Sequence, residues 1–430
     1  MNILILGSGG REHALVWRLG QDKSTSSVHV WPGNAGMEFM KGSAKEKLHF
    51  VNTPFNKQNF SQVIKELGIG MVIPGAEKFL YEGVADWCLE MNIPCMGPSR
   101  EAAQLEESKL FSKSVMTAAG IPTARYRDIT RAFREDIEMA FEVIKGFKKP
   151  VIKLSGPALG KGVFVCDSHA EAVDALHQIK LNPMPGIEEG IFVEEGLAGK
   201  EVSLFYACHD EEFLFLGAAQ DHKRLLDQDK GPNTGGMGAI SPVSWADKSF
   251  INSATEKFLL PTLREMKSRG TPFTGILFLG LMVDGDSENL LEYNVRFGDP
   301  ETQTILPLID GDLTSALYNL AIGESVSGIT LKNEVAVHIV KAARGYPGLF
   351  GEVVEKGQKI SSSILEDAHT QFFFAGVRRN GDDLLTDGGR VLGVTTWEKS
   401  RDLARSLAYR KIQEMSFSGE QFRKDIGAKE

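Results

Sequence analysis

The stretch MNILILGSGGREHAL at residues 1–15 sets the fold expected for the start of the chain. Its apolar run at 2–6 ends in glycine and predicts a buried β-strand, and residues 11–19 predict the helix that follows. The same order of apolar run, turn and helical pattern recurs, with strands expected at 28–31 and 71–74. Strands that alternate with helices indicate a doubly wound, parallel α/β domain.

The glycines after the first strand are candidate ligands for an anion. Exposed N–H groups and the helix dipole at such a helix start favour a phosphate, which makes Gly9, Gly10 and Arg11 candidate binding residues. A dinucleotide fingerprint is excluded, because Glu12 stands where GxGxxG requires its third glycine. A tight turn without a ligand is the alternative interpretation.

Two further turns lie just past the carboxyl ends of expected strands, where ligands bind in open α/β sheets. They are PGNAG at 32–36, which contains Asn34, and the tripeptide Gly75-Ala76-Glu77. Taken singly, each is more often a plain turn.

Length and composition describe an ordinary globular protein. The 430 residues, 42% of them hydrophobic, suggest roughly two to four domains with a buried core. The net charge of −9, from 57 acidic and 48 basic residues, argues against a general nucleic-acid binder, because affinity for the phosphate backbone comes mainly from Lys and Arg. A local basic pocket for a small phosphorylated substrate is compatible with this charge.

The cysteines and the apolar runs indicate a cytoplasmic protein without a membrane span. Cys88, Cys95, Cys166 and Cys208 form no CxxC pair, so we expect free thiols in a reducing compartment and neither a zinc site nor a disulfide framework. The N-terminal apolar run is too short for a signal peptide. The longest apolar stretch, at 275–283, is far below the about 18 residues of a spanning helix.

The middle and the end of the chain differ in pattern. A strand is expected at 94–97 and a strong helix at 106–119, followed from about 126 to 181 by a small α+β unit. Beyond residue 334 the chain is β-rich. Strands are expected there at 335–341, 372–377 and 390–395.

SGPALGKG at 155–162 lies between two expected strands and favours nucleotide binding. Gly160 and Gly162 let the backbone approach phosphate oxygens, and Lys161 supplies positive charge. Lys153, on the preceding strand, is a second cation aimed at the same place. A P-loop is excluded, because Gly162 stands where Ser or Thr is required.

A pair of acids ends the next apolar run. Backbone groups at a hinge such as VEEGL at 193–197 can read an adenine edge, and a carboxylate of Glu194, Glu195 or Glu201 can hold ribose hydroxyls. A solvated charged turn is the alternative, and for this motif alone it is the preferred one.

Acids, bases, amides and glycines are densest in DHKRLLDQDKGPNTGGMGAISP at 221–242 and LLEYNVRFGDPETQ at 290–303. Glu292 and Asn294 are two residues apart, so on a strand they point to the same face and offer two oxygen ligands to Mg²⁺. Arg296 follows on the turn. A metal strand paired with a basic, glycine-rich loop indicates ATP-dependent chemistry on an anionic substrate. A strand with one polar face is the alternative.

These motifs occur together with ESK at 107–109, GYPG and TDGGRVL. In this order they resemble the glycinamide ribonucleotide synthetases of the ATP-grasp superfamily, over nearly the whole chain. The resemblance implies an α/β and α+β multidomain fold. Its parts are an N-terminal doubly wound parallel α/β domain at 1–104, an ATP-grasp domain at 105–328 with a lid subdomain at about 124–190, and a C-terminal β-rich domain at 329–430.

The resemblance also implies a reaction. ATP would convert glycine to glycyl phosphate, which 5-phosphoribosylamine would attack to give glycinamide ribonucleotide, ADP and phosphate, the second step of de novo purine synthesis. ATP and Mg²⁺ or Mn²⁺ are the implied cofactors, and the two substrates are the implied small-molecule partners. Neither nucleic acid nor membrane is expected as a partner, and we expect a monomer or weak dimer.

Roles for the candidate residues follow from the same resemblance. The residues implied to bind ATP are Lys109, Lys153, Lys161, Gly160, Gly162, Glu194, Glu195, Leu197 and Glu201. The implied metal ligands are Glu292 and Asn294. The implied catalytic residues are Arg296, Lys223 and Asp221. The residues implied to bind the other substrates are Gly9, Gly10, Arg11, Asn34, Glu77, Asn233, Thr234, Gly235, Gly236, Asp299, Pro300 and Glu301.

Two other functions stay open at the level of sequence. Ser155, Pro157, Lys341, Arg344 and Phe374 depart from the family pattern, which allows a paralogue that joins a different amine to an amino acid with the same ATP chemistry. A binding module that holds nucleotide without turnover is the second alternative. The intact phosphoryl-transfer residues named above argue against it.

Overall fold

The computed structural model describes residues 1–157, 162–348, 352–362 and 368–428. The N-terminal part is a four-stranded parallel sheet in the order β3-β2-β1-β4. Its strands are β1 (Asn2–Gly7), β2 (Ser27–Pro32), β3 (Leu48–Phe50) and β4 (Ile69–Pro74). The order reverses between β1 and β4, so the loops after these two strands flank the switch point where ligands bind in open α/β sheets. The predicted doubly wound domain is confirmed.

Helices cover this parallel sheet, and the first of them lies where the sequence predicts a helix at 11–19. They are α1 (Gly10–Leu19), α2 (Gly42–Glu46), α3 (Lys57–Glu66), α4 (Glu77–Tyr81) and α5 (Val84–Glu90). The strand expected at 94–97 is wrong, because only a single bridge joins Val72 to Cys95.

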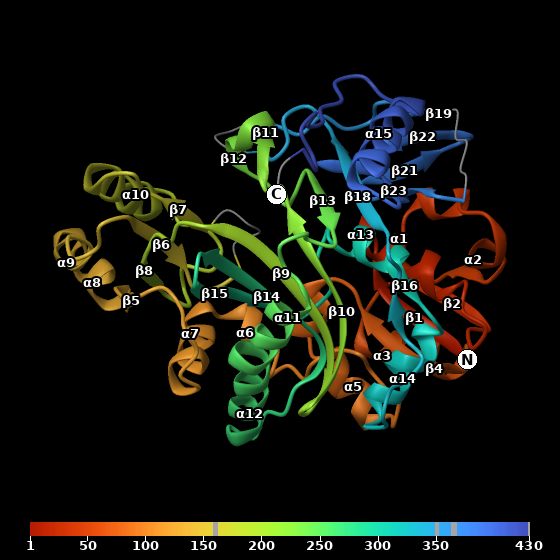
Figure 1. Cartoon of the computed structure of the whole chain (residues 1–430), viewed down its shortest axis with the longest axis horizontal. Helices are drawn as coiled ribbons and strands as arrows, with labels where there is room; N and C mark the ends of the chain where they lie inside the picture. Colours follow the sequence, from red (N-terminus) through yellow and green to blue (C-terminus); the bar gives the residue numbers. More distant parts are fainter. Residues whose placement is uncertain (158–161, 349–351, 363–367, 429–430) are drawn as a thin grey trace.

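An eight-stranded antiparallel sheet runs through the central and C-terminal parts in the order β15-β14-β9-β10-β13-β18-β23-β20 (Figure 1). Its central strands are β9 (Lys200–His209), β10 (Glu212–Asp221), β13 (Gly238–Ser241), β14 (Thr274–Asp284) and β15 (Ser287–Asn294). Its C-terminal strands are β18 (Val335–Ala342), β20 (Thr370–Phe374) and β23 (Arg390–Glu398). The β-rich end of the chain therefore continues the central sheet, through pairing of β13 with β18.

The predicted lid subdomain has a sheet and a core of its own. Its sheet has the order β5-β8-β6-β7, formed by β5 (Tyr126–Asp128), β6 (Pro150–Leu154), β7 (Val163–Val165) and β8 (Ile191–Glu195). Its helices are α8 (Thr130–Glu135), α9 (Ile137–Ile144) and α10 (His169–Leu181). Figure 1 shows this unit projecting away from the N-terminal sheet, at the left of the molecule.

The helix expected at 106–119 is wrong as a single element. It consists of α6 (Gln104–Glu107) and α7 (Lys109–Ala118), which meet at Ser108. The Ser108 side chain accepts a hydrogen bond from the backbone N–H of Phe111 at 3.3 Å and thereby caps α7. The break turns the start of α7 toward the lid, where the backbone N–H of Lys109 donates to the Ser155 carbonyl at 2.9 Å.

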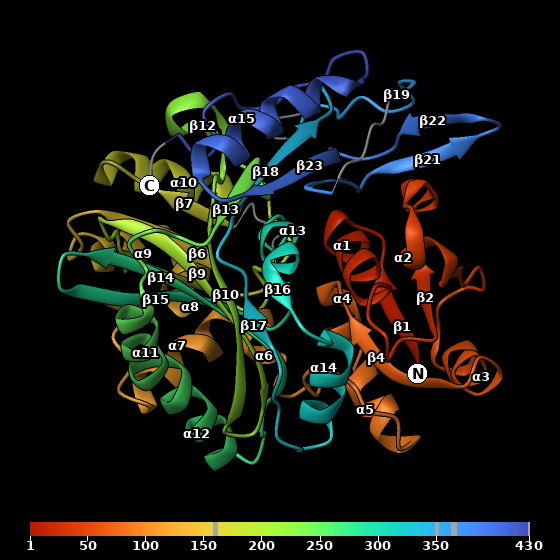
Figure 2. The ribbon, with the colours of Figure 1, turned by 45° about the vertical axis from the view of Figure 1, so that its right-hand side comes forward.

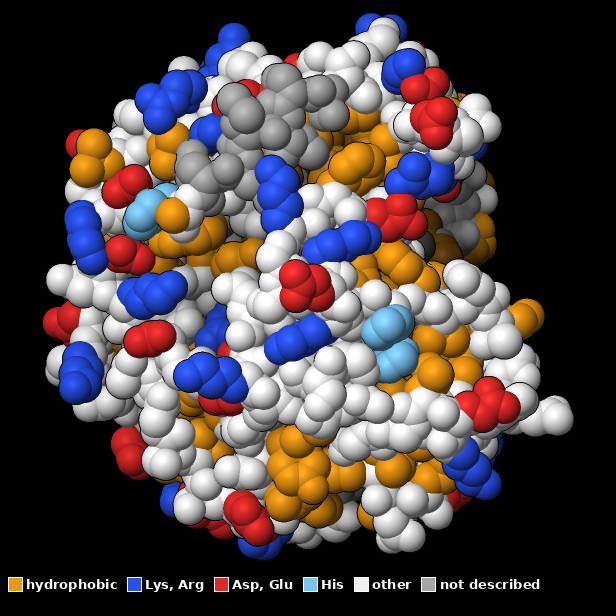
Figure 3. Space-filling view, turned by 90° about the vertical axis from the view of Figure 1, so that its right-hand side faces the viewer, with side chains coloured by type: hydrophobic (Ala, Val, Ile, Leu, Met, Phe, Trp, Pro, Cys, Tyr) orange, Lys and Arg blue, Asp and Glu red, His pale blue; other side chains and the backbone are white. Residues whose placement is uncertain are grey.

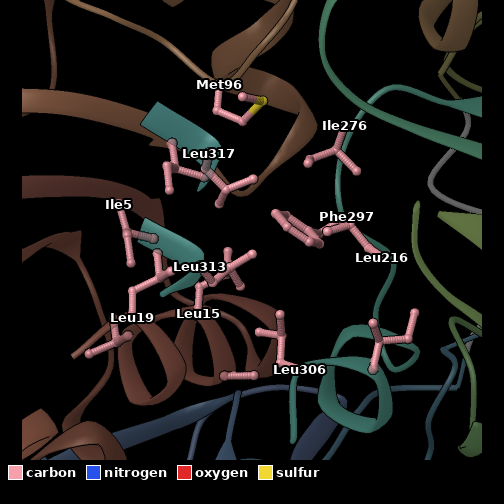
Figure 4. Close-up of a cluster of buried hydrophobic side chains, with 14 of the residues drawn as sticks. Ile5, Leu15, Leu19, Met96, Leu216, Ile276, Phe297, Leu306, Leu313 and Leu317 are labelled. Atoms are coloured by element: carbon pink, nitrogen blue, oxygen red, sulfur yellow. The ribbon is translucent and has the colours of Figure 1, made fainter. Parts of the chain in front are cut away.

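A shared apolar core fixes the N-terminal sheet against the central part. Ile5, Leu15 and Leu19 pack in one buried cluster with Phe297 and with α14 (Leu313–Ala321), as Figure 4 shows. Each fully buried side chain of this kind contributes about 1.5–3 kcal/mol to folding. The loop after β1 is therefore held in a defined position relative to the segment after β15.

The C-terminal part lies against the N-terminal part, as the turned view of Figure 2 shows. Its main helix, α15 (Arg401–Lys411), packs on β18 and β23. The backbone N–H of Phe374 in β20 donates to Nδ1 of His13 in α1 at 3.0 Å. The two chain regions farthest apart in sequence thus form one contiguous body.

Surface and span features are unexceptional. On the face in Figure 3, Lys and Arg side chains are interspersed with Asp and Glu side chains and with uncharged surface. Among the described residues, no helix combines the length and the apolarity that a membrane span requires. The remaining helices are α11 (Lys248–Ala254), α12 (Leu260–Ser268) and α13 (Thr302–Ile305).

Candidate active site

The glycine loop after β1 abuts the turn after β15. A side-chain Cβ at Gly9 would lie 3.4 Å from Oδ2 of Asp299, and one at Gly10 would lie 2.7 Å from Nε2 of Gln303. A side chain at Gly10 would require the Gln303 amide, which donates to Oδ1 of Asp299 at 2.8 Å, to move. The structure therefore brings Gly9, Gly10 and Asp299 together, although 289 residues separate Gly10 from Asp299 in sequence.

Arg11 is buried beneath the loop. Its Nε lies 2.6 Å from Oε1 of Glu12, its Nη2 lies 3.6 Å from Oε2 of Glu77, and its Nη1 donates to the Phe297 carbonyl at 3.0 Å. Glu12 in turn accepts from the Gly9 backbone N–H at 2.5 Å. Arg11 thus connects the loop to the central part, and the two neighbouring carboxylates offset its charge.

Asn34 uses its whole amide to join three loops. Its Oδ1 accepts from the Gly36 backbone N–H at 2.9 Å, and its Nδ2 donates to the carbonyls of Ser8 at 2.8 Å and Phe374 at 2.9 Å. The side chain is buried. Its position next to the switch point agrees with a site there, and its hydrogen bonds make it a support of that site.

The polar face of β15 carries Glu292 and Asn294 side by side. Tyr293 and Val295, which alternate with them, are buried in the hydrophobic core, as a period of two requires. Burial would raise the pKa of the Glu292 carboxyl, but Lys223, Lys153, Lys109 and Arg296 outweigh it and hold this pKa below its usual value. The carboxylate therefore stays ionised at neutral pH.

One carboxylate and one amide oxygen on a strand, surrounded by cations, suit a hard divalent ion. Such an ion takes oxygen ligands and completes its octahedron with phosphates and water. No group of three or more His, Cys, Asp or Glu side chains able to hold a metal occurs among the described residues. The donor set thus fits an ion that arrives with a phosphate-bearing substrate better than one enclosed by protein ligands alone.

Arg296 follows this strand and is held from several sides. Its Nη2 lies 2.8 Å from Oε1 of Glu106 and donates to Oδ1 of Asn294 at 3.2 Å, and its Nε lies 3.6 Å from Oε2 of Glu77. The other oxygen of Glu106 accepts from the Val295 backbone N–H at 2.8 Å. Glu106 was missed from the sequence, where its only signal is its place before the ESK motif.

Basic side chains cluster between α7 and the lid. Nζ of Lys153 lies 2.5 Å from Oε1 of Glu194, and Nζ of Lys113 lies 2.8 Å from its Oε2. Glu194 is only 3% exposed, so it acts here as the counter-ion of two lysines. Nζ of Lys109 donates to the Gly156 carbonyl at 3.5 Å. Lys113 was also missed, because a lysine in the second turn of a helix has no motif of its own.

Burial lowers the pKa of Lys109, against the opposing effect of Glu292. Gly162 follows the segment predicted to bind nucleotide, and its carbonyl accepts from the Leu154 backbone N–H at 2.8 Å. Gly160 and Lys161 lie outside the described residues.

The hinge acids diverge in position. Glu195 turns away from Glu194 and accepts from the backbone N–H groups of Lys149 at 2.8 Å and Lys148 at 3.2 Å. Glu201, at the start of β9, lies 2.7 Å from Nζ of Lys223. Leu197 lies on the connection between β8 and β9.

Two carboxyl groups lie beside the glycine-rich loop: Glu301 is buried, and Asp221 is partly buried with its Oδ1 shielded from solvent. Burial, reinforced by Glu301, raises the pKa of Asp221 well above its usual value, and burial also raises the pKa of Glu301. Oδ1 of Asp221 has no hydrogen-bond partner among the described residues. A Cβ at Gly236 would lie 2.6 Å from that oxygen and 2.4 Å from Cδ of Pro300. The pair can therefore hold a proton next to a space large enough only for glycine backbone.

The loop from Asn233 to Gly236 is fixed by residues from the central and C-terminal parts of the chain. The backbone N–H and Oγ1 of Thr234 donate to the Lys223 carbonyl at 2.7 and 2.8 Å. The Gly235 backbone N–H donates to the Tyr346 hydroxyl at 2.8 Å. Arg390 donates to the Gly235 carbonyl and lies 3.1 Å from Oδ2 of Asp299. Tyr346 belongs to GYPG and Arg390 belongs to TDGGRVL, two motifs to which the sequence alone assigns no role.

Three of the sequence departures have structural explanations. Ser155 is fully buried, and its Oγ accepts from the Leu110 backbone N–H at 3.2 Å, at the start of α7. Phe374 stacks on His13 with ring centroids 5.9 Å apart, between the N- and C-terminal parts. Arg344 forms a surface ion pair with Glu355 at 3.4 Å. None of these three contacts is made with Glu292, Asn294 or Arg296.

Comparison with known proteins extends over the whole chain. The phosphoribosylglycinamide synthetase N domain matches residues 1–106, its ATP-grasp (A) domain matches 107–302, and its C domain matches 336–429. The chain is 39% identical to a phosphoribosylamine–glycine ligase of Streptomyces coelicolor, over 100% of this chain and 99% of that protein. It is 38% identical to the corresponding ligase of Rhizobium meliloti, over 99% of this chain and 98% of that protein.

Solved structures give the same relationship. A phosphoribosylamine–glycine ligase of Thermotoga maritima superposes with a TM-score of 0.83 at 33% identity, covering 99% of this chain and 100% of that one. The biotin carboxylase domain of a Hydrogenobacter thermophilus 2-oxoglutarate carboxylase gives a TM-score of 0.72 at 15% identity, covering 98% of this chain and 91% of that one. The second likeness concerns the fold alone.

Proposed function

Because the chain belongs to the phosphoribosylglycinamide synthetase family, we propose that it is an ATP-dependent phosphoribosylamine–glycine ligase. It joins glycine to 5-phosphoribosylamine and releases glycinamide ribonucleotide, ADP and phosphate. This reaction is the second step of purine biosynthesis. The relatives carry this activity in their names, and the chain covers nearly all of their length.

The observation that carries the proposal is the arrangement around β15. Glu292 and Asn294 lie on one face of this strand. Four cations, Lys109, Lys153, Lys223 and Arg296, lie close enough to Glu292 to lower its pKa. Phosphoryl transfer depends mostly on positioning and on neutralising phosphate charge, and this set of side chains is suited to both. A Mg²⁺ or Mn²⁺ ion held by Glu292 and Asn294 would add charge neutralisation on the phosphates when bound.

The residues divide the reaction between two sides of the site. Lys109, Lys153 and the loop that contains Gly160, Lys161 and Gly162 would bind the ATP phosphates, next to an adenosine site at Glu194, Glu195, Leu197 and Glu201. Arg296 would contact the phosphoryl group as it moves to the glycine carboxylate. Because an acyl phosphate is a good leaving group, glycyl phosphate then needs only a correctly placed amine, and no nucleophile from the protein.

The second side would bind glycine and the sugar amine. Asp221 and Lys223 lie beside the loop that contains Asn233, Thr234, Gly235 and Gly236, with Asp299, Pro300 and Glu301 opposite. The phosphate of 5-phosphoribosylamine would lie at the backbone of Gly9 and Gly10, with Arg11, Asn34 and Glu77 supporting that loop. Their raised pKa values make Asp221 and Glu301 stronger bases than ordinary carboxylates, so the ionised form of either is suited to accept the proton lost by the attacking amine.

The same proposal includes a cellular setting. All four cysteines are free, as is typical of a reducing compartment, which supports a cytoplasmic location. A monomer or weak dimer is proposed as the working form. Light scattering coupled to gel filtration measures the mass directly, and a stable tetramer would contradict it.

The function is tested by ADP release with ATP, Mg²⁺ and glycine, with and without 5-phosphoribosylamine formed in place from ribose 5-phosphate and ammonia. We expect turnover that requires both glycine and the sugar amine. Turnover that ignores the sugar amine would indicate a paralogue with another amine substrate. Nucleotide binding without turnover would indicate a binding module.

A further inference from the structure

A hairpin next to the site is held by a segment almost 200 residues later in the chain. The hairpin consists of β11 (Arg224–Leu226) and β12 (Lys230–Asn233), joined by a turn at 227–229. β12 is largely solvent-exposed and β11 is partly exposed, and an isolated two-stranded hairpin is marginally stable in water. Figure 1 shows the hairpin at the top of the molecule, close to the C-terminal label. Its position must therefore depend on what it contacts.

Each residue of the turn is bonded to the segment at 423–425. Oδ1 of Asp227 accepts from the Lys424 backbone N–H at 2.8 Å. The Gln228 backbone N–H donates to Oδ2 of Asp425 at 2.7 Å. Gln228 and Asp229 have φ values of 61° and 53°, a left-handed conformation that residues other than glycine rarely adopt. Contacts from outside the hairpin are thus needed to hold this turn.

Arg423 makes the central contact and is only 1% exposed. Its Nη1 lies 2.7 Å from Oδ1 of Asp229 and donates to the Arg224 carbonyl at 3.1 Å. Its Nε and Nη2 donate to the two oxygens of Asp425, both at 2.8 Å. A planar guanidinium serves these partners at once, which an ammonium group cannot do.

The hydrogen bond from Arg423 to the Arg224 carbonyl lies one residue away from Lys223. Arg224, whose carbonyl Arg423 binds, follows Lys223 directly, and the Lys223 carbonyl accepts both hydrogen bonds of Thr234. The guanidinium of Arg423 therefore fixes the point where the hairpin meets the glycine-rich loop.

The segment at 423–426 is itself held rigidly. Nε and Nη2 of Arg405 on α15 donate to the carbonyls of Ile426 at 3.0 Å and Lys424 at 2.9 Å. The Tyr409 hydroxyl donates to the Arg423 carbonyl at 3.0 Å and accepts from the Ile426 backbone N–H at 2.9 Å. Ile426 is fully buried in the core beneath α15. The hairpin is therefore attached to a fixed point of the C-terminal part.

We propose that Arg423 and Asp425 are positioning residues for the ligase reaction, acting through the hairpin on Lys223 and on the loop at 233–236. This inference rests on the proposed function, because the loop matters only as the glycine and amine side of the site. Within the described part of the chain, the segment at 423–425 makes no hydrogen bond or ion pair with Lys109, Lys153 or Glu292. Its loss therefore acts directly on the glycine and amine side, and it reaches the nucleotide side only through the ion pair between Lys223 and Glu201.

The test is steady-state kinetics of Arg423→Ala, varied in each substrate. We expect kcat/KM for glycine to fall about 100-fold, the effect of misplacing a group by about 1 Å, while the KM for ATP stays within about threefold. Millimolar guanidinium ion restores part of the activity of this variant, and Arg423→Lys restores little because it lacks the fork. The matched control is Arg410→Ala, an exposed arginine on α15, which leaves all parameters unchanged.

The possible results distinguish the proposed ligase function from the positioning role of Arg423. A wild-type protein without ligase turnover contradicts the proposed function, whatever the variants do. An active wild type with an unchanged kcat/KM for glycine in Arg423→Ala overturns the positioning role. Equal losses for all substrates with a lowered melting temperature and no rescue by guanidinium also overturn it, because they indicate a structural role only. If Arg423→Ala does not fold, Asp425→Asn and Asp229→Asn weaken the same contact from either side, and both must show the split between glycine and ATP.

Discussion

The carboxylate of Glu292 is the negative charge that the cations of the site share. This carboxylate is surrounded by four cations, Lys109, Lys153, Lys223 and Arg296. They lower its pKa and so keep it ionised, and its negative charge offsets their mutual repulsion. Removing that carboxylate takes away both a proposed metal ligand and the common counter-charge. The face is half-exposed and does not contribute a side chain to the core, so the fold should tolerate the change.

We expect Glu292→Ala to lower Mg²⁺-dependent turnover by two orders of magnitude or more, because charge stabilisation by a metal ion is worth about several kcal/mol. It should also remove the extra thermal stabilisation that Mg²⁺ gives to the ATP-bound protein, which differential scanning fluorimetry measures. Asp286→Ala, in the exposed turn before β15, is the control. Turnover that survives in Glu292→Ala would refute the metal assignment.

Asp221 offers a separate test through pH. Its folded-state pKa is raised, so the neutral carboxyl favours folding below the unfolded pKa of about 3.9, and this contribution is lost as pH rises through the folded pKa. Asp221→Asn should therefore raise the melting temperature at pH 7–8, and the difference from wild type should shrink below about pH 4. Activity should fall at the same time. A variant that is less stable than wild type at pH 8 would contradict a buried, proton-holding carboxyl.

Among the elements, the loop between β12 and β13 is constrained by close packing. Gly236 has a φ of +107°, and a Cβ there would overlap both Asp221 and Pro300. Local sequence patterns identify this loop as glycine-rich, but they do not say which glycine is irreplaceable. The surrounding residues come from β10 and from the turn after β15, so the answer depends on tertiary structure.

Gly236→Ala should lose nearly all ligase activity and about 2–4 kcal/mol of stability, since backbone strain and a steric overlap add. Gly270→Ala is matched in conformation, with a φ of +80°, but no atom lies within 4 Å of its added Cβ. It should lose only about 1 kcal/mol and keep its activity. Chemical denaturation measures the free energy of unfolding, and ADP release measures the ligase activity. Equal behaviour of the two variants would show that the overlap is unimportant.

Sequence patterns predict some of these elements correctly and miss others. Periods of 2 and 3.6 residues correctly place β1, α1 and the polar face of β15, because burial on one side imposes them locally. The strand expected at 94–97 fails because only one residue of it pairs with a neighbour. The helix expected at 106–119 breaks because Ser108 caps α7 against the lid. Glu106, Lys113, Arg390 and Arg423 were missed because the partners that give them their roles lie between 81 and 199 residues away or because their motifs name no chemistry.

Over the whole molecule, Arg390 connects three regions. It extends from the C-terminal strand β23 to Gly235 in the central part and to Asp299, which in turn lies against Gly9. Opposite charges and geometry make this a strong contact, because the guanidinium binds a carboxylate and two backbone carbonyls together. The site is thus assembled across all parts of the chain.

Arg390→Lys should keep the charge but lose the fork, and we expect kcat/KM for the sugar amine to fall about 10- to 100-fold with a small change in melting temperature. Arg378→Ala, an exposed arginine of the same region, is the control. If Arg390→Lys retains full activity, the contact contributes charge alone.

The contact between Arg390 and Gly235 also bears on the order of events during translation. The two residues are 155 positions apart, and at about 5–20 residues per second the later one follows the earlier by roughly ten to thirty seconds. Until the ribosome has released β23, the glycine-rich loop has neither the guanidinium nor the Tyr346 hydroxyl that hold it. A nascent chain can therefore complete its N-terminal sheet and begin its central one while its catalytic centre is still unformed. Reactive glycyl phosphate would then be made only by molecules whose synthesis has passed β23.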